Sequence, residues 1–304
     1  MPYTLERSYG ALLLLLLIAA AWLATVAHGQ VVQPVPTQGS NRTAAGPQAA
    51  ARVRGYLEPA ERPDSLQLVP PPPRKGSAEY EADLAMHRAM RTLRDTPRWQ
   101  LAIADANVQF PHAASTFACA LGMPVTEAET PNLYSVLQRA MIDAGQATGR
   151  AKDEYRRPRP FDLFDTRICV PGEAAALRKS PAYPSGHASA GWAWALILTE
   201  IAPDRATPIL RRGYEFGLSR VVCGVHWLSD IDAGRTVGAA TVARLHAKPE
   251  FVAQLALARE EVARARASGR PPGPDCVAES RALAANDRSM TGAAKSASRT
   301  SPAR

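Results

Sequence analysis

Residues 183–198 read YPSGHASAGWAWALIL, and the apolar part of this stretch decides the fold. A helix over residues 188–198 would be apolar on every side, with Trp192 and Trp194 among its side chains. A helix of that kind must be buried all round. We therefore expect a helix over Ser185–Ile201 at the centre of a helical bundle, with both tryptophans in the core.

The segments around this stretch also have helical patterns. From residue 78 to residue 266 they are rich in Ala, Leu, Glu, Arg and Met, and few alternate as strands do. The sequence therefore predicts an all-α, single-domain bundle around the central apolar helix. The other expected helices cover residues 78–94, 97–107, 132–155, 172–179, 205–222, 226–246 and 249–267.

The first 29 residues have the pattern of a cleavable signal peptide. Arg7 precedes an apolar run over residues 11–24, which small residues follow. The run is shorter than the ~20 residues of a membrane span, and no later segment is long enough. We expect a periplasmic or secreted protein without stable membrane association. An uncleaved N-terminal anchor is the alternative.

The segments that flank the expected domain, residues 56–268, differ from it in composition. Residues 30–55 are rich in Pro, Gln, Ala and Thr, which predicts a linker. The domain opens on a Pro-rich arm that ends in VPPPPRK, residues 69–75, and should be extended. Residues 269–304 are small, polar and low in complexity, which predicts a disordered tail.

The formal charge of +8 lies mainly in these flanks. Residues 76–268 contain 23 basic and 21 acidic side chains. The folded region is therefore almost balanced in charge, which argues against a nucleic-acid-binding face.

Four cysteines occur in a chain that we expect to be exported, where disulfides are permitted. Three complete pairings are possible, and the sequence does not choose among them. No cysteine lies in a CxxC pair or in a His/Cys cluster with zinc-site spacing. The cysteines are Cys119, Cys169, Cys223 and Cys276.

The first motif is AKDEYRRPRPFD, residues 151–162, where Pro160 should halt the preceding helix. A run of cations is usually a solvated face. Arg159, however, lies between two prolines, and Lys152 lies two turns earlier on a similar face if the helix extends that far. An arginine fork and a lysine point charge can together hold a phosphate. The cations of the motif are Lys152, Arg156, Arg157 and Arg159.

The second motif is PSGH, residues 184–187. Ser185 can simply cap the central helix. The first N–H groups of a helix also bind anions, and Gly186 would allow a ligand to approach the backbone closely. His187 would then stand beside the anion with a titratable proton.

The third motif is SRVVCGVHWLSD, residues 219–230. His226 and Asp230 are four residues apart, so on one helix they would be neighbours, either as a surface pair or as an oriented nucleophile. Gly224 should break the chain and turn Arg220 towards the same centre. With the other motifs, this makes three cations, an anion-binding helix start and two histidines, which is what phosphoryl transfer without a metal requires.

These spacings resemble the signature of the acid phosphatase and vanadium haloperoxidase superfamily. Over residues 56–266 the chain is most similar to the bacterial class A non-specific acid phosphatases, through PDSLQLVPPPP, AKDEYRRPRPF, YPSGH with GWAWAL, and SRVVCGVHW with SDIDAGR. The matching spacings are Lys152-x6-Arg159-Pro160, Pro184-Ser185-Gly186-His187 and Ser219-Arg220-x5-His226-x3-Asp230.

The resemblance implies an exported, metal-independent and cofactor-free enzyme that hydrolyses small phosphomonoesters with broad specificity, as a homo-oligomer. It implies that His226 attacks phosphorus to form a phosphohistidine, that Asp230 orients His226, and that His187 protonates the leaving alcohol. The implied phosphate-binding residues are Lys152, Arg159, Ser185, Gly186 and Arg220, with the N–H groups of Ser185 and Gly186 as donors.

Three other functions fit parts of the pattern. A vanadium-dependent haloperoxidase would share the anion site, but the class A flanks argue against it. A membrane lipid phosphatase would need several spans. A catalytically silent phosphate-binding protein would have no use for two histidines and Asp230.

Overall fold

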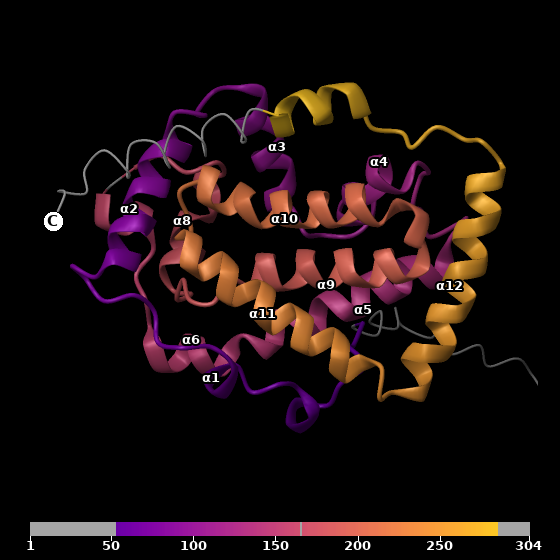
Figure 1. Cartoon of the computed structure of the whole chain (residues 1–304), viewed down its shortest axis with the longest axis horizontal. Coiled ribbons are helices and arrows are strands. Elements are labelled where there is room, and N and C mark those ends of the chain that lie inside the picture. Colours follow the sequence, from indigo (N-terminus) through magenta and orange to yellow (C-terminus); the bar gives the residue numbers. More distant parts are fainter. Residues whose placement is uncertain (1–52, 165, 285–304) are drawn as a thin grey trace, which may run out of the picture. The chain divides into compact units, whose positions relative to one another are not determined.

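The computed structural model describes residues 53–164 and 166–284. Within these ranges no strand occurs, which confirms the predicted all-α fold (Figure 1). The expected signal peptide, most of the expected linker and residues 285–304 lie outside the described residues. The α-helices are α1 (Ser65–Leu68), α2 (Ala78–Arg91), α3 (Pro97–Ala106), α4 (Ala118–Leu121), α5 (Pro131–Ala147), α6 (Gly149–Tyr155), α7 (Pro160–Phe164), α8 (Ala174–Arg178), α9 (Gly186–Ile201), α10 (Ala206–Val222), α11 (Leu228–Leu245) and α12 (Pro249–Ala267). The short 3₁₀ helices are η1 (Pro59–Glu61), η2 (His112–Phe117), η3 (Pro171–Glu173) and η4 (Pro203–Arg205).

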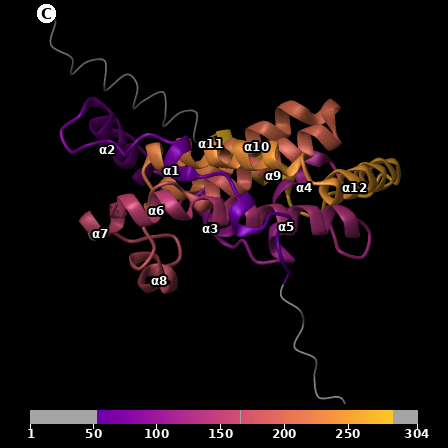
Figure 2. The same cartoon turned by 90° about the horizontal axis from the view of Figure 1, so that it is seen from below.

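Helix α9 is the central helix, as its apolar sequence predicts. It packs mainly against α10, α11 and α5, and Figure 2 shows α5 below the layer that α9, α10 and α11 form. Trp194 is 1% exposed, and its Nε1 donates to the carbonyl of Leu137 at 2.7 Å. Trp192 is only partly buried and packs against the same core.

Glycines allow α11 to lie directly on the first turns of α9. A Cβ atom at Gly234 would lie 2.5 Å from the carbonyl oxygen of Ser185, and one at Gly238 would lie 2.4 Å from that of Ser189. No side chain fits at these distances. The two backbones therefore approach closely where α9 begins, and this contact fixes the start of α9 relative to α11.

Several expected helices have different bounds in the structure, and two of these differences lie beside the sequence motifs. The helix expected over residues 132–155 is divided at Thr148 into α5 and α6. The helix expected from His226 begins only at Leu228, because Trp227 has an extended backbone with ψ 161° at the N-cap. Sequence periodicity did not reveal α1, α4 and α7, which are only four or five residues long.

The four cysteines form two disulfides, Cys119–Cys276 and Cys169–Cys223. The second bond joins the loop before η3 to the short segment between α10 and α11. The first bond attaches the segment after α12 to the start of α4.

The expectation of a disordered tail from residue 269 is wrong for part of that segment. Residues 276–284 are helical, and Ala282 and Leu283 are buried. Glu279 lies 3.4 Å from the buried Arg212 as an ion pair. The disulfide at Cys276 supplies a covalent anchor, which composition alone does not reveal.

The Pro-rich arm lies on the bundle. The N–H of Tyr56 donates to Asp143 at 2.6 Å, and the Tyr183 hydroxyl donates to the carbonyl of Pro70 at 2.7 Å. The contacts begin before the expected boundary, because Arg139 donates to the carbonyl of Gly55 at 3.2 Å.

Among the helices of the described residues, none combines the length and the apolar character that crossing a membrane requires.

Gly238→Ala should destabilise the protein, because its Cβ would collide with the backbone of Ser189. We expect the free energy of unfolding to fall by about 1–3 kcal/mol, the usual cost of overpacking. Gly145→Ala in α5 is the matched control, since nothing lies within 4 Å of its new Cβ. The control should gain about 0.5–1 kcal/mol. Urea unfolding measures both, and equal stabilities would contradict the proposed close contact.

A chain that ends at Gly269 should melt at a lower temperature than the full chain, because it lacks the Cys119–Cys276 bond. Loss of a native disulfide costs about 2–5 kcal/mol in small secreted domains. Cys119→Ser in the same chain prevents artefacts from the free thiol. A chain that ends at Ala284 keeps the bond and should have the same melting temperature as the full chain in calorimetry. Equal melting temperatures for both truncated chains would show that the bond adds no stability.

Candidate active site

The predicted site residues meet where α9 begins. The N–H of Ser185 donates to the main-chain oxygen of Asp230 at 2.9 Å. Arg159 Nη1 lies 3.0 Å from His226 Nε2. The structure thus brings together segments that lie far apart in the sequence. The residues gathered here are Lys152, Arg159, Ser185, Gly186, His187, Arg220, His226 and Asp230.

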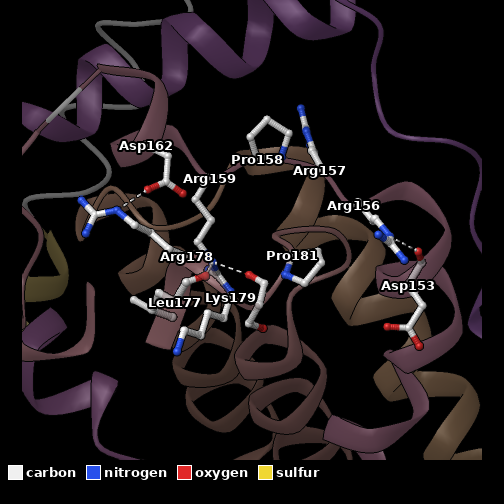
Figure 3. Close-up of a pocket in the computed structure, with 11 residues that line it drawn as sticks. Asp153, Arg156, Arg157, Pro158, Arg159, Asp162, Leu177, Arg178, Lys179 and Pro181 are labelled. Carbon is white, nitrogen blue, oxygen red and sulfur yellow. Dashed lines mark hydrogen bonds and ion pairs between the residues drawn. The ribbon is translucent and has the colours of Figure 1, made fainter. Parts of the chain in front are cut away.

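Main-chain carbonyls of residues 177–181, the cation-anchoring segment, hold both cations of the first motif. Lys152 Nζ donates to the oxygen of Pro181 at 2.6 Å. Arg159 Nε donates to two carbonyls of the segment, at 3.0 and 2.9 Å, and Figure 3 shows its side chain extending to them. Both cations are therefore positioned before any anion binds.

The prediction that Lys152 and Arg159 share a helix face is wrong. Helix α6 ends at Tyr155, and Arg156 turns the chain with a positive φ of 42°. Pro160 begins α7 instead of halting α6. The two cations come together through the cation-anchoring segment and not through helical spacing.

A pocket of about 500 Å³ opens beside Arg159 (Figure 3). The exposed Arg156 and Arg178 also line it, and Arg178 Nε donates to Asp162 at 3.0 Å. Figure 3 shows the side chains of Arg157 and Arg159 leaving the chain in opposite directions. The site therefore borders a cationic surface that attracts anionic molecules.

Ser185 is the N-cap of α9, as predicted, and its Oγ accepts from the N–H of Ala188 at 3.2 Å. Its own N–H is bonded to Asp230. The expectation that this N–H binds a phosphate is therefore wrong, and only the Ser185 hydroxyl can donate. The N–H of Ala188 is bonded to Ser185 Oγ, and the N–H of Ser189 is bonded to the main-chain oxygen of Ser185. The N–H groups of Gly186 and His187 are therefore the ones left for an anion.

His187 Nε2 lies 3.1 Å from the carbonyl oxygen of Ala106. A carbonyl can only accept, so this nitrogen carries a proton. Burial, and then the charge of Arg220, hold the pKa of His187 well below its usual value. The ring is therefore neutral while the site holds no anion.

Arg220, at the end of α10, is 1% exposed. Its Nε has no hydrogen-bond partner among the described residues. Its ion pair with Glu173 spans 3.9 Å, and burial lowers its pKa to about 10. Gly224, with a positive φ of 74°, turns the chain after α10 as predicted. A buried guanidinium with an unused donor is suited to an anionic ligand.

His226 precedes α11, and Asp230 lies in its first turn. His226 Nδ1 is 3.1 Å from Asp230 Oδ2, which also accepts from the N–H of Trp227 at 2.8 Å. A carboxylate accepts the Nδ1 proton, so the His226 Nε2 lone pair faces Arg159. The pair forms through this capping geometry and not through two positions on one helix face.

Burial and repulsion between cations dominate the electrostatics. Burial and Arg159 lower the pKa of Lys152 to about 7. Burial and Arg220 lower the pKa of Arg159 to about 10. Burial, Arg159 and Lys152 also hold the pKa of His226 well below its usual value. An anion among these groups would relieve the repulsion.

Two further charged residues, Arg157 and Asp83, belong to the site although the sequence motifs did not identify them. Arg157 donates to Asp230 at 2.6 Å and to Asp83 at 2.7 Å, and both carboxylates are buried. Arg157 and Arg159 are buried, whereas Arg156 and Pro158 are exposed. The alternation of arginine and proline over residues 157–160 was the signal that could have identified Arg157. No local signal marks Asp83, which comes from α2.

Comparisons with known proteins agree on the family. The model of the PAP2 superfamily matches residues 133–251. The non-specific acid phosphatase of Providencia stuartii is 44% identical over 210 residues, which are 69% of this chain and 85% of that protein. The non-specific acid phosphatase of Salmonella typhimurium is 40% identical over 70% of this chain and 86% of its own.

The acid phosphatase of Zymomonas mobilis is 40% identical over 69% of this chain and 79% of its own. Among solved structures, a bacterial vanadium-dependent iodoperoxidase aligns with a TM-score of 0.45 and 18% identity, over 70% of this chain and 62% of that one. At the identity and coverage of its curated relatives, the chain belongs to the bacterial class A non-specific acid phosphatases of the PAP2 superfamily, and it is an enzyme that hydrolyses phosphomonoesters.

Proposed function

We propose that hydrolysis proceeds through a phosphohistidine at His226 Nε2. One observation above all supports this: the Nδ1 side of the ring faces Asp230 at 3.1 Å, while Nε2 lies 3.0 Å from Arg159. The ring therefore presents a lone pair beside a buried cation. A phosphoryl group bound by that cation would lie within reach of the nucleophile.

Lys152, Arg159 and Arg220 would hold the three non-bridging oxygens of the phosphoryl group, with the N–H groups of Gly186 and His187 as further donors. The Arg159 proton that now points to His226 would turn to a phosphate oxygen. Charges in a buried site interact more strongly than in water, so these contacts stabilise a transferring phosphoryl group effectively.

In the first step the His226 Nε2 lone pair forms a bond to phosphorus as the ester P–O bond breaks. The leaving oxygen takes a proton from His187. In the second step water attacks phosphorus, gives its proton to His187, and the P–N bond breaks. Phosphate leaves, and both histidines return to their first states.

The low pKa of His187 in the empty site is compatible with a role as acid. The causes are burial and neighbouring cations, Arg220 first among the charges. A bound phosphate dianion offsets those cations and raises the pKa of His187. Protonation of the acid is thereby coupled to substrate binding.

We propose export to the periplasm or medium, broad specificity for small phosphomonoesters, and assembly as a homo-oligomer. The two disulfides support export, since such bonds persist in oxidising compartments. The cationic pocket beside Arg159 supports attraction of phosphorylated substrates without a pocket shaped for one leaving group. The homo-oligomer rests on the family resemblance alone.

Two histidine variants test the proposed roles. His226→Ala removes the nucleophile, so turnover should fall to background with every leaving group. His187→Ala removes only the acid, so the loss should be about 10²–10⁴-fold for a sugar-alcohol leaving group and far smaller for an activated phenol.

The measurement is steady-state hydrolysis of both substrate types, with rapid quenching to trap labelled phosphoenzyme. His246→Ala is the matched control, because its exposed ring contacts Glu200 and Phe251, neither of which belongs to the site. Trapped phosphate on the His226→Ala protein, or equal losses for both leaving groups in His187→Ala, would refute the assignment.

Anion affinity should decrease as pH rises through about 7. The pKa of Lys152 is lowered to about 7, so its charge is present below that pH and is lost above it. The measurement is the inhibition constant of sulfate as a function of pH. Sulfate stays a dianion over the pH range tested, so a change in affinity reports the protein and not the ligand. Lys152→Arg stays charged and should flatten the profile. A wild-type inhibition constant that is constant from pH 5 to about pH 9 would contradict this prediction.

A further inference from the structure

Arg157 bridges two buried carboxylates from different helices. Its Nη1 donates to Asp230 Oδ1 at 2.6 Å, and its Nη2 donates to Asp83 Oδ2 at 2.7 Å. The three side chains are 6% exposed or less. Asp83 comes from α2, Arg157 from the loop after α6, and Asp230 from α11. We call this arrangement the Asp83–Arg157–Asp230 bridge.

The bridge is held in place by further contacts. Asp83 Oδ1 accepts from the N–H of Ser229 at 2.9 Å, so Asp83 also caps the first turn of α11. Arg157 Nη1 donates to Ser229 Oγ at 2.7 Å. The guanidinium lies 5.3 Å from the centre of the Trp227 ring. The position of Arg157 is therefore fixed by charge, hydrogen bonds and an aromatic face together.

Arg157 is directed away from the place where phosphate would bind. Its Nη groups are engaged with Asp230, Ser229 and Asp83. Figure 3 shows its side chain pointing in the direction opposite to that of Arg159. This geometry does not bring Arg157 into contact with the substrate. It places Arg157 where it can act on the site through its hydrogen bond to Asp230.

We propose that Arg157 is a positioning residue that keeps Asp230 ionised and oriented, so that His226 presents an unprotonated Nε2 to phosphorus. Asp230 is completely buried, and a buried carboxylate without a cation takes up a proton. A protonated Asp230 would no longer fix the Nδ1–H tautomer of His226. The inference rests on the proposed role of His226 as nucleophile.

The charges around Asp230 agree with this role. Burial raises the pKa of Asp230. Among the charges that lower this pKa, Arg157 has the largest effect and Lys152 has a smaller one. Arg157 also helps to lower the pKa of His226. The other charged or titratable groups that face this pair are Asp83, Arg159, Tyr183, His187 and Arg220.

Arg157→Met removes the cation and retains much of the side chain's bulk. We expect kcat to fall roughly 10–100-fold, by analogy with the loss typical for groups that orient a metal-bound histidine. The acid limb of the kcat profile should move to higher pH, since the pKa values of Asp230 and His226 both rise when the cation is lost. Inhibition by sulfate should change little. Arg88→Met, at an exposed position of α2 outside the pocket, is the matched control and should behave as wild type.

Two further variants separate charge from geometry, and they also serve if Arg157→Met fails to fold. Arg157→Lys keeps the charge but loses the fork, so kcat should fall while the acid limb stays near that of wild type. Asp83→Asn removes the second anchor and leaves the cation beside Asp230. Its kcat should also fall, without an upward shift of the acid limb.

The inference is overturned if Arg157→Met keeps kcat within about twofold of wild type, a factor worth only ~0.4 kcal/mol. It is also overturned if the variant loses sulfate binding while its acid limb is unchanged, because Arg157 would then act on the anion. Rapid quenching of the wild-type protein distinguishes a deeper failure. If no phosphate is trapped on His226, the proposed function is wrong; if phosphate is trapped there and Arg157→Met is phosphorylated at the wild-type rate, only the role of Arg157 is wrong.

Discussion

The carboxylate of Asp230 is the interaction on which the site depends. One of its oxygens accepts from His226 and from the N–H of Trp227, and the other accepts from Arg157. Its main-chain oxygen accepts from Ser185, which caps the central helix. Removing one partner of a buried charge pair costs about 3–5 kcal/mol, so this single residue couples the stability of the α9–α11 junction to the state of His226, the proposed nucleophile.

The cations of the site are costly to the fold, and in the proposed mechanism they are useful to catalysis. Lys152, Arg159 and Arg220 are brought together in a buried region where each is disfavoured by burial, and Lys152 and Arg159 also by a neighbouring cation. Packing of α9 against α10 and α11 supplies the stability that holds them there. An anionic substrate offsets this repulsion when it binds. The same cations therefore lower the stability of the empty protein and raise its affinity for an anionic substrate.

Much of this arrangement could be predicted from the sequence, because the decisive signals are local. A helix that is apolar on all sides has to be central, and a Ser before Gly-His has to cap it. The turn at Gly224 follows from the same kind of reasoning. The four-residue spacing also pointed to His226 and Asp230 as partners, although the structure joins them through the cap of α11 and not through one helix face.

Other features depend on tertiary contacts that no local pattern encodes. The break at Thr148 lies inside a continuous helical pattern. The burial of Arg157 requires Asp83 from a helix about 70 residues earlier. The helix after residue 275 is attached to the bundle by the Cys119–Cys276 disulfide. The sequence allowed three complete pairings of the four cysteines and did not choose this one.

The cation-anchoring segment has a consequence for how such an enzyme can diverge. Residues 177–181 hold Lys152 and Arg159 through main-chain oxygens, so the anchoring does not depend on which side chains the segment bears. Leu177, Arg178 and Lys179 line the adjoining pocket. In the proposed mechanism, evolution can therefore replace these side chains and alter which leaving groups are accepted, while the backbone keeps the two proposed phosphate-binding cations where they are.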